Sequence, residues 1–302
     1  MSTNTLATVL ALIASAIFAL STVLQQRGGL KAPALSLGHP ASFARLAQQK
    51  TWLIGMALLI PGWTLQAMAL DRGRVAVIQP IFTLGVVFIL PLGYWLTNQT
   101  VTWQQVGEAA LIVVGLVLFI LLGDPAGGRN NAPNWQWLIA IAILAAIAWL
   151  MISVAGEKKL SLKAGAYGTA SGIGNGLAAT LTKPVVEQLH TGGLGAVLLD
   201  WKLYALAIGG LLGIVFQQIA LQTARLAPAV ASGAVVNPLV GVTLGIVLLQ
   251  ERLAPPAWHK VVAFCGLGLA LAASAAIALS QERASKEAAA DGPVTPDFAT
   301  SG

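Results

Sequence analysis

Residues 217–279 contain two long apolar runs separated by a short charged break, Gln250-Glu251-Arg252. Each run has about the 20 residues that a helix needs to cross the hydrocarbon core of a bilayer. The whole chain has the same character, because 57% of its 302 residues are apolar and only 9% are charged. Soluble domains carry about 25% charged residues. A soluble fold could not bury this much apolar surface, so the sequence predicts an all-α integral membrane protein.

Nine apolar segments are long enough to form spanning helices. They cover residues 6–24, 52–70, 75–95, 103–122, 137–154, 164–185, 201–221, 226–249 and 258–279. Between them lie a basic loop at 25–51, with a short surface helix predicted over 41–49, and a breaker-rich stretch at 123–133. Residues 281–302 have no apolar period and are predicted to form a disordered tail.

A nine-residue pattern occurs twice, 151 residues apart. Gln66-x-x-Ala69-Leu70-x-x-x-Arg74 matches Gln217-x-x-Ala220-Leu221-x-x-x-Arg225, and each copy joins one apolar segment to the next. Five segments separate the copies, an odd number, so the two units point in opposite directions across the membrane. The alternative is a chance recurrence of four matched positions in apolar sequence of low diversity.

This pattern predicts two inverted transmembrane repeats. The first occupies residues 1–123 and the second residues 164–280, with a loop and a linker helix at 124–163 and a cytoplasmic tail at 281–302. Inverted repeats are typical of secondary transporters, whose substrate site lies near the bilayer midplane between the repeats.

Lysine and arginine predict the orientation. With nine spanning helices, the odd-numbered loops and the tail share one side, which holds ten of the 17 basic residues against seven on the other. Two dense clusters, within 27–50 and 158–163, lie on that first side. Because cytoplasmic loops carry an excess of Lys and Arg, we expect the tail in the cytoplasm and the N-terminus outside the cell membrane.

Polar side chains inside apolar segments are expensive in a membrane unless they are paired or line a cavity, so they are the candidates for a substrate pathway. The candidates are Gln66, Gln79, Thr83, Asn175, Thr180, Thr182, Lys183, Gln217, Gln218 and Asn237. For any one of them, the ordinary explanation is an interhelical hydrogen bond worth about 0.6–2 kcal/mol. Their concentration in five of the nine segments favours a functional role for the set.

Lys183 closes the sixth segment at the predicted outer end, just before Pro184. Proline disfavours helical geometry at the preceding residue, so we expect the helix to distort there and expose carbonyl groups. A lysine at this place could act on a passing ion. The alternative is snorkelling, in which the four-carbon stem carries the ammonium to the outer headgroups.

Acidic side chains are absent from the middle of the predicted membrane segments. Glu251 lies at a turn beside Arg252, where the two are expected to form a solvated pair. A proton relay would ordinarily use a buried carboxylate or histidine, and the three histidines lie in loops or at segment ends.

A membrane enzyme is the hypothesis of a different class, and a scaffold is another. Thr169-Ala-Ser171-Gly172 is partly similar to the nucleophile motif of intramembrane serine proteases, but Thr169 stands where that motif has glycine. No histidine is available at membrane depth as a base, and zinc-binding and hydrolase motifs are absent from the sequence. We therefore expect a protein that is not an enzyme, with no catalytic residue and no cofactor, and metal ligands stay unassigned.

At this point the residues resemble a known family. Val235-Val-Asn-Pro-Leu, then Leu249-Gln-Glu251-Arg-Leu and a glycine-rich last segment, is similar to the EamA-type domain of the drug/metabolite transporter superfamily. The order of the whole chain resembles the NIPA-type magnesium transporter branch, which also has nine helices. The similar points are Gln26-Arg27-Gly-Gly-Leu30, the Gln79-Pro80 step, Lys183, and Gln218 with Leu221-Gln222.

The resemblance implies transport of a small molecule or ion. The apolar composition makes the lipid bilayer a partner, the net charge of +6 is spread over loops and does not indicate nucleic-acid binding, and a homodimer is left open. Two acidic positions of the NIPA-type pattern are filled differently, because Trp63 follows Gly62 and Gln99 stands at the end of the third segment. Mg²⁺ usually takes carboxylate ligands. A drug/metabolite-type carrier in the cell membrane is therefore expected, with a magnesium or other divalent-cation permease as the alternative.

Overall fold

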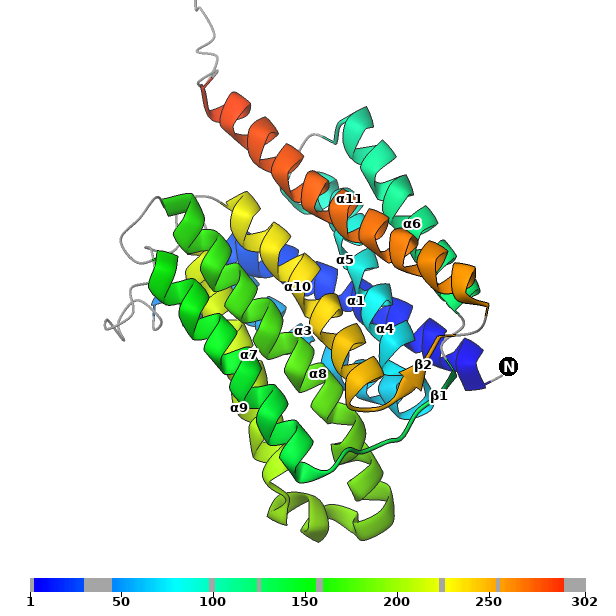
Figure 1. The fold of residues 1–302 in the computed structure, drawn as a ribbon. Coiled ribbons are helices and arrows are strands. Elements are labelled where there is room, and N and C mark those ends of the chain that lie inside the picture. Colours follow the sequence, from blue (N-terminus) through cyan, green and yellow to red (C-terminus); the bar gives the residue numbers. More distant parts are fainter. Residues whose placement is uncertain are drawn as a thin grey trace, which may run out of the picture.

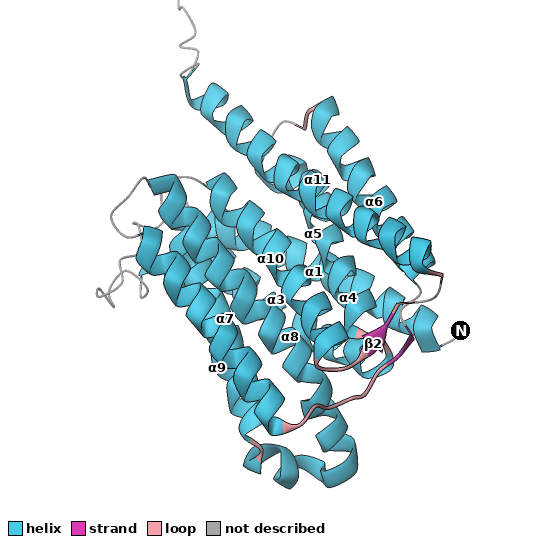
Figure 2. Ribbon diagram, viewed as in Figure 1, coloured by secondary structure: helices cyan, strands magenta, loops and turns pink. Residues whose placement is uncertain are grey.

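The computed structural model of the protein describes residues 3–29, 45–97, 101–123, 126–155, 160–222, 226–253 and 256–290. These residues form a bundle of long helices with one short pair of strands at one end (Figures 1 and 2). The elements are α1 (Thr3–Gly29), α3 (Lys50–Arg72), α4 (Val75–Ile81), η1 (Phe82–Leu84), α5 (Gly85–Thr97), α6 (Trp103–Gly123), β1 (Ala126–Gly127), α7 (Asn134–Ala155), α8 (Leu160–Leu199), α9 (Trp201–Gln222), α10 (Leu226–Val247), β2 (Glu251–Arg252) and α11 (Ala257–Ala290).

Seven helices of the described chain are long and apolar enough to cross a membrane. They are Thr5–Gly29, Lys50–Arg72, Val75–Leu96, Trp103–Gly123, Asn134–Ala155, Trp201–Ala220 and Ala257–Ile277, and each corresponds to one predicted segment. The other two predicted segments are also helical, as parts of α8 and α10, and Ser232–Val247 of α10 forms a shorter apolar helix. The chain is thus a predominantly α-helical, multi-pass membrane protein.

Two predicted boundaries are wrong. Residues 281–290 were expected to be disordered, but α11 continues through them to Ala290. This stretch is rich in alanine, glutamate and lysine, which have high helix propensity even without an apolar stripe. The sixth segment was expected to end at residue 185, but helical structure runs on to Leu199. Of the surface helix predicted over 41–49, residues 45–47 are helical, and 41–44 lie outside the described residues.

The expected distortion at Lys183 is also wrong, because α8 continues through Pro184 and departs from helical dihedral angles only at Gly193 (φ 71°, ψ −175°). The hydroxyls of Thr180 and Thr182 each donate to the carbonyl four residues earlier, which is the helical pattern in the turn before the proline. Proline is tolerated in spanning helices where neighbouring groups satisfy the freed backbone.

Helices α1 and α3 run antiparallel in close contact. A Cβ atom added to Gly28 would lie 2.6 Å from the Cβ of Trp52, whereas one added to Gly73 would lie 3.0 Å from the Cβ of Ala7. The end of α1 therefore meets the start of α3, and the start of α1 meets the turn after α3. This arrangement gives the bundle two ends that can be named by their residues.

The third spanning segment is not one continuous α-helix. Pro80 lies inside α4, and the turn Phe82–Leu84 that follows is a 3-10 helix before α5 begins. Proline removes one backbone donor and crowds the carbonyl of the preceding turn, which accounts for the change of helix type. Mid-helix 3-10 turns often mark functional positions, and this one lies against α1 and α10.

Candidate functional site

Gln79 and Thr83 are buried polar side chains on the interrupted third segment. Gln79 is 0% exposed and Thr83 is 3% exposed, and their spacing of four residues places them on one helix face. Neither polar atom of the Gln79 amide, nor the Thr83 hydroxyl, has a hydrogen-bond partner among the described residues. Two of the predicted pathway residues therefore stand together at the helix break.

Ser15 lies at the same break, and Asn237 lies one turn before Gly241, the α10 residue that packs against Gln79. A Cβ atom added to Gly241, one turn after Asn237 on α10, would lie 2.3 Å from Cγ of Gln79. One added to Gly85, directly after η1, would lie 3.4 Å from Oγ of Ser15 on α1. The buried oxygens Asn237 Oδ1 and Ser15 Oγ also lack partners within the described chain.

We call Ser15, Gln79, Thr83 and Asn237 the central polar group. A buried polar group without a hydrogen bond costs about 1–3 kcal/mol in proteins, and in a bilayer no water from the solvent can relieve it. Each of the four side chains has at least one buried polar atom without a partner among the described residues. The group offers amide and hydroxyl donors and acceptors and carries no charge, so it can hold a polar solute by hydrogen bonds.

Glu251 is buried at one end of the bundle and binds the start of α4 by hydrogen bonds. It is only 2% exposed, and its carboxylate accepts hydrogen bonds from the backbone N–H groups of Val75 (2.8 Å) and Ala76 (2.7 Å) at the start of α4. A carboxylate at this position satisfies backbone donors that a helix start leaves free and complements its dipole. The expectation that Glu251 is solvated beside Arg252 is wrong.

Lys183 completes this arrangement from α8. Its ammonium lies 3.6 Å from Glu251 Oε1 and donates to the carbonyl of Gly73 at 3.1 Å, and its side chain is 11% exposed. The ammonium is therefore directed into the protein, and the snorkelling alternative is wrong. We call Gly73, Val75, Ala76, Lys183 and Glu251 the Glu251 contact; it joins residues of the first predicted repeat to residues of the second.

A strap from the breaker-rich stretch covers the Glu251 contact. Strands β1 and β2 pair antiparallel, with Gly127 opposite Glu251. The Arg129 side chain donates to the Leu248 carbonyl at 2.8 Å, and Arg74 donates to the Gly127 carbonyl at 3.2 Å. The stretch that was predicted only to separate the halves thus binds to both of them.

The opposite end of α1 carries a second polar contact, which is uncharged. Gln218 on α9 donates from Nε2 to Gln25 Oε1 at 2.8 Å, and Gln25 donates to the Ser21 hydroxyl at 2.9 Å. Ser21 in turn donates to the carbonyl of Gly55 at 2.7 Å. We call these four residues the Gln25 contact. It also joins the two predicted repeats, because Gln218 lies in the second and the others lie in the first.

The two contacts lie at opposite ends of the bundle. Gly73 touches Ala7 near the start of α1, and Gln25 is 18 residues further along the same helix, or about 27 Å at 1.5 Å per residue. Ser15 lies between them on α1, and Thr83 is eight residues, about 12 Å, from the start of α4. The central polar group therefore lies between the Glu251 contact and the Gln25 contact.

The remaining predicted candidates have ordinary roles or no contact that bears on a site. Asn175 donates to the Ser171 hydroxyl, which donates to the Gly213 carbonyl, so this pair joins α8 to α9. Thr180 and Thr182 bond within α8. Gln66 and Gln217 are both half-buried, and their approach to one cavity stays a prediction.

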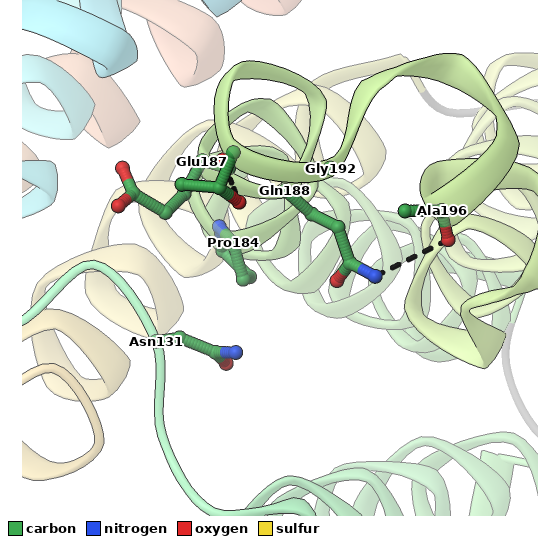
Figure 3. Close-up of a pocket in the computed structure, with 7 residues that line it drawn as sticks. Asn131, Pro184, Glu187, Gln188, Gly192 and Ala196 are labelled. Carbon is green, nitrogen blue, oxygen red and sulfur yellow. Dashed lines mark hydrogen bonds between the residues drawn. The ribbon is translucent and has the colours of Figure 1, made fainter.

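A surface pocket of about 210 Å³ lies beyond Lys183 on α8. Figure 3 shows Asn131 facing Pro184 across the pocket. The Gln188 amide donates to the carbonyl of Ala196, which follows the non-helical residue Gly193. The carboxylate of Glu187 accepts a hydrogen bond from Asn130. The pocket is at the Glu251 end of the bundle. In the described part of the chain, no three His, Cys, Asp or Glu side chains lie together as a metal site would require.

Sequence reasoning missed Ser15, Gln25 and Glu251. Ser15 lies in an apolar segment and follows the rule that identified the other candidates. Gln25 was assigned to the polar loop, and α1 extends through it to Gly29. Glu251 gave no local signal, because its partners are 68 or more residues away in sequence.

Comparisons with known proteins give one informative likeness. An uncharacterized protein from Corynebacterium glutamicum is 27% identical over 290 residues, which cover 93% of this chain and 96% of that protein. No protein-family model matches the chain, and no solved structure matches it. The likeness extends over nearly the full length of both chains, and the name of the Corynebacterium glutamicum protein assigns no activity.

Proposed function

We propose that the protein is a secondary transporter of the drug/metabolite type that moves a small polar solute across the cytoplasmic membrane. The observation that carries the proposal is the central polar group, in which the Gln79 amide, the Ser15 and Thr83 hydroxyls and the Asn237 amide oxygen are buried without partners in the described chain. A membrane protein keeps such groups at a cost in stability, and a solute that supplies the missing hydrogen bonds explains why they are retained.

The packing supports two halves of inverted topology. In the first half α1 packs along α3 and against α4 and α5; in the second half α8 packs along α9 and against α10. Each half carries an amide followed by proline in its third helix, Gln79-Pro80 and Asn237-Pro238, and these helices pack together. A substrate site where the repeats meet is the usual arrangement in such transporters.

The chemistry of the central polar group favours an uncharged or weakly charged solute over a divalent cation. Its four side chains are two amides and two hydroxyls, and the buried carboxylate of Glu251 is occupied by two backbone N–H groups and Lys183. Mg²⁺ is usually held by one or two carboxylates and retained waters. We therefore place the magnesium-type permease second.

The test compares the solutes that accumulate inside and outside cells expressing the wild type or the double variant Thr83→Val, Asn237→Leu. Both substitutions remove a polar group while keeping similar size. We expect a small set of polar solutes to differ between the two cultures at equal membrane insertion. Identical solute pools would contradict the proposal. Restored growth of a magnesium-auxotrophic host would instead favour the divalent-cation permease.

A further inference from the structure

We propose that the Glu251 contact is the outer gate of the solute pathway and that it is the tighter of two gates, so that the resting protein opens toward the cytoplasm. The inference rests on the proposed function and adds how access to the central polar group is controlled. It follows from the unequal chemistry of the two contacts that join the halves.

The outer contact is charged and has many parts. The Glu251 carboxylate receives two backbone N–H groups from the first half at 2.7 and 2.8 Å, and the Lys183 ammonium reaches both Glu251 and the Gly73 carbonyl. Hydrogen bonds that involve an ionised group are roughly twice as strong as neutral ones. Separating the halves here would leave a buried charge without its partner, which is among the most unfavourable outcomes inside a protein.

The inner contact is neutral, and among the described residues a single hydrogen bond of this contact joins the halves. Gln218 donates to Gln25 at 2.8 Å, and the other two hydrogen bonds of this contact lie within the first half. When the contact opens, the amide groups lose a single cross-half bond and can be rehydrated from the adjacent aqueous face. Thermal opening therefore favours the Gln25 end.

Opening of the outer contact would expose the central polar group. Gln79 is four residues after Val75, whose N–H group binds Glu251. It therefore lies about 6 Å, or one helical turn, further along the same segment. On the α10 side, a Cβ atom on Gly245 would lie 2.8 Å from Glu251 Oε2, and one on Gly241 would lie 2.3 Å from Gln79. The end of α10 thus packs against both Glu251 of the gate and Gln79 of the central polar group.

The experiment needs no known substrate. Thr83→Cys serves as a reporter in a Cys265→Ser background, since Cys265 is the only cysteine and is exposed. A membrane-impermeant methanethiosulfonate reagent is added to intact cells, which exposes the outer face, or to inside-out vesicles. The labelling rate of the reporter is measured from each side in the parent and in the variants Glu251→Gln, Lys183→Met and Gln25→Leu.

We expect the parent reporter to react faster from the cytoplasmic side. Glu251→Gln and Lys183→Met should each raise the outer rate at least about tenfold, the change expected when a charged contact is reduced to a neutral one. Gln25→Leu should raise the cytoplasmic rate and leave the outer rate no higher. Glu187→Gln is the matched control, because its carboxylate lies at the same end of α8 and bonds only to Asn130 among the described residues.

Three results would overturn the gate. The first is an outer labelling rate that stays at the parent value in both Glu251→Gln and Lys183→Met. The second is an equal rise of the outer rate in the control Glu187→Gln. The third is a change in Glu251→Gln and Lys183→Met of the labelling rate from the cytoplasmic side only. Lys183→Met keeps both backbone hydrogen bonds to Glu251. It therefore tests the gate even if the Glu251→Gln protein does not insert into the membrane. A reporter that reacts from neither side in any variant contradicts the transporter proposal itself, which separates the two failures.

Discussion

Gln79 packs directly against Gly241, so that a single Cβ atom on Gly241 would lie 2.3 Å from Cγ of Gln79. The two residues belong to the third helices of the two predicted repeats. At this contact the Gln79 amide is fully buried and has no hydrogen-bond partner among the described residues. An unpaired amide at the meeting point of two halves gives the protein a feature that stability alone does not explain.

Replacing Gln79 by leucine should stabilise the protein. The substitution removes a buried unsatisfied amide whose desolvation costs about 1–3 kcal/mol and keeps a similar volume. Gln25→Leu is the control of opposite sign, because Gln25 has two hydrogen bonds to lose. Thermal unfolding in detergent should give a raised midpoint for Gln79→Leu and a lowered midpoint for Gln25→Leu. A lowered midpoint for both would mean that Gln79 is paired in the folded protein.

Gly241→Ala should destabilise the protein and displace Gln79. Overpacking a filled contact costs about 1–3 kcal/mol. Gly268→Ala is the matched control, because Gly268 is also helical and its added Cβ meets nothing within 4 Å; it should be neutral or slightly stabilising. The comparison is made by thermal unfolding, and equal midpoints for the two variants would contradict the described packing.

Lys183 and Glu251 should behave as one unit in a double-mutant cycle. Lys183→Met leaves a buried carboxylate without its counter-ion, and breaking such a pair costs about 3–5 kcal/mol. The double variant Lys183→Met, Glu251→Gln should be less destabilised than the sum of the two single variants, because neither charge remains. Strict additivity of the unfolding free energies would show that the pair does not interact.

Much of the fold and part of the candidate site could be predicted from the sequence. Composition and apolar length gave the membrane class, and the rule that polar residues inside spanning helices need a reason gave Gln79, Thr83 and Asn237. The helical extension to Ala290 was missed because apolar periodicity was used where helix propensity decides. The partners of Glu251 could not be predicted, because they depend on how β1 and the starts of α4 and β2 meet in space.

The orientation predicted from basic residues can be checked independently of function. Single cysteines placed at Ser36 and Ser285, with Cys265 removed, should both resist an impermeant thiol reagent in intact cells, because both positions are expected in the cytoplasm. Ser36 lies outside the described residues, and Ser285 lies within α11. Labelling of Ser36→Cys alone would put the two positions on opposite sides, which means that an odd number of spanning helices separates them and not the expected eight.

Transport by Gln79→Leu tests the central claim most directly. Once the comparison of solute pools identifies a solute, wild-type and Gln79→Leu protein are reconstituted into vesicles at equal density, and counterflow of the labelled solute is measured. The account predicts that Gln79→Leu is at least as stable as the wild type and loses transport, because the amide that binds the solute is gone. Transport at the wild-type rate by Gln79→Leu would contradict the claim that the central polar group is the solute site.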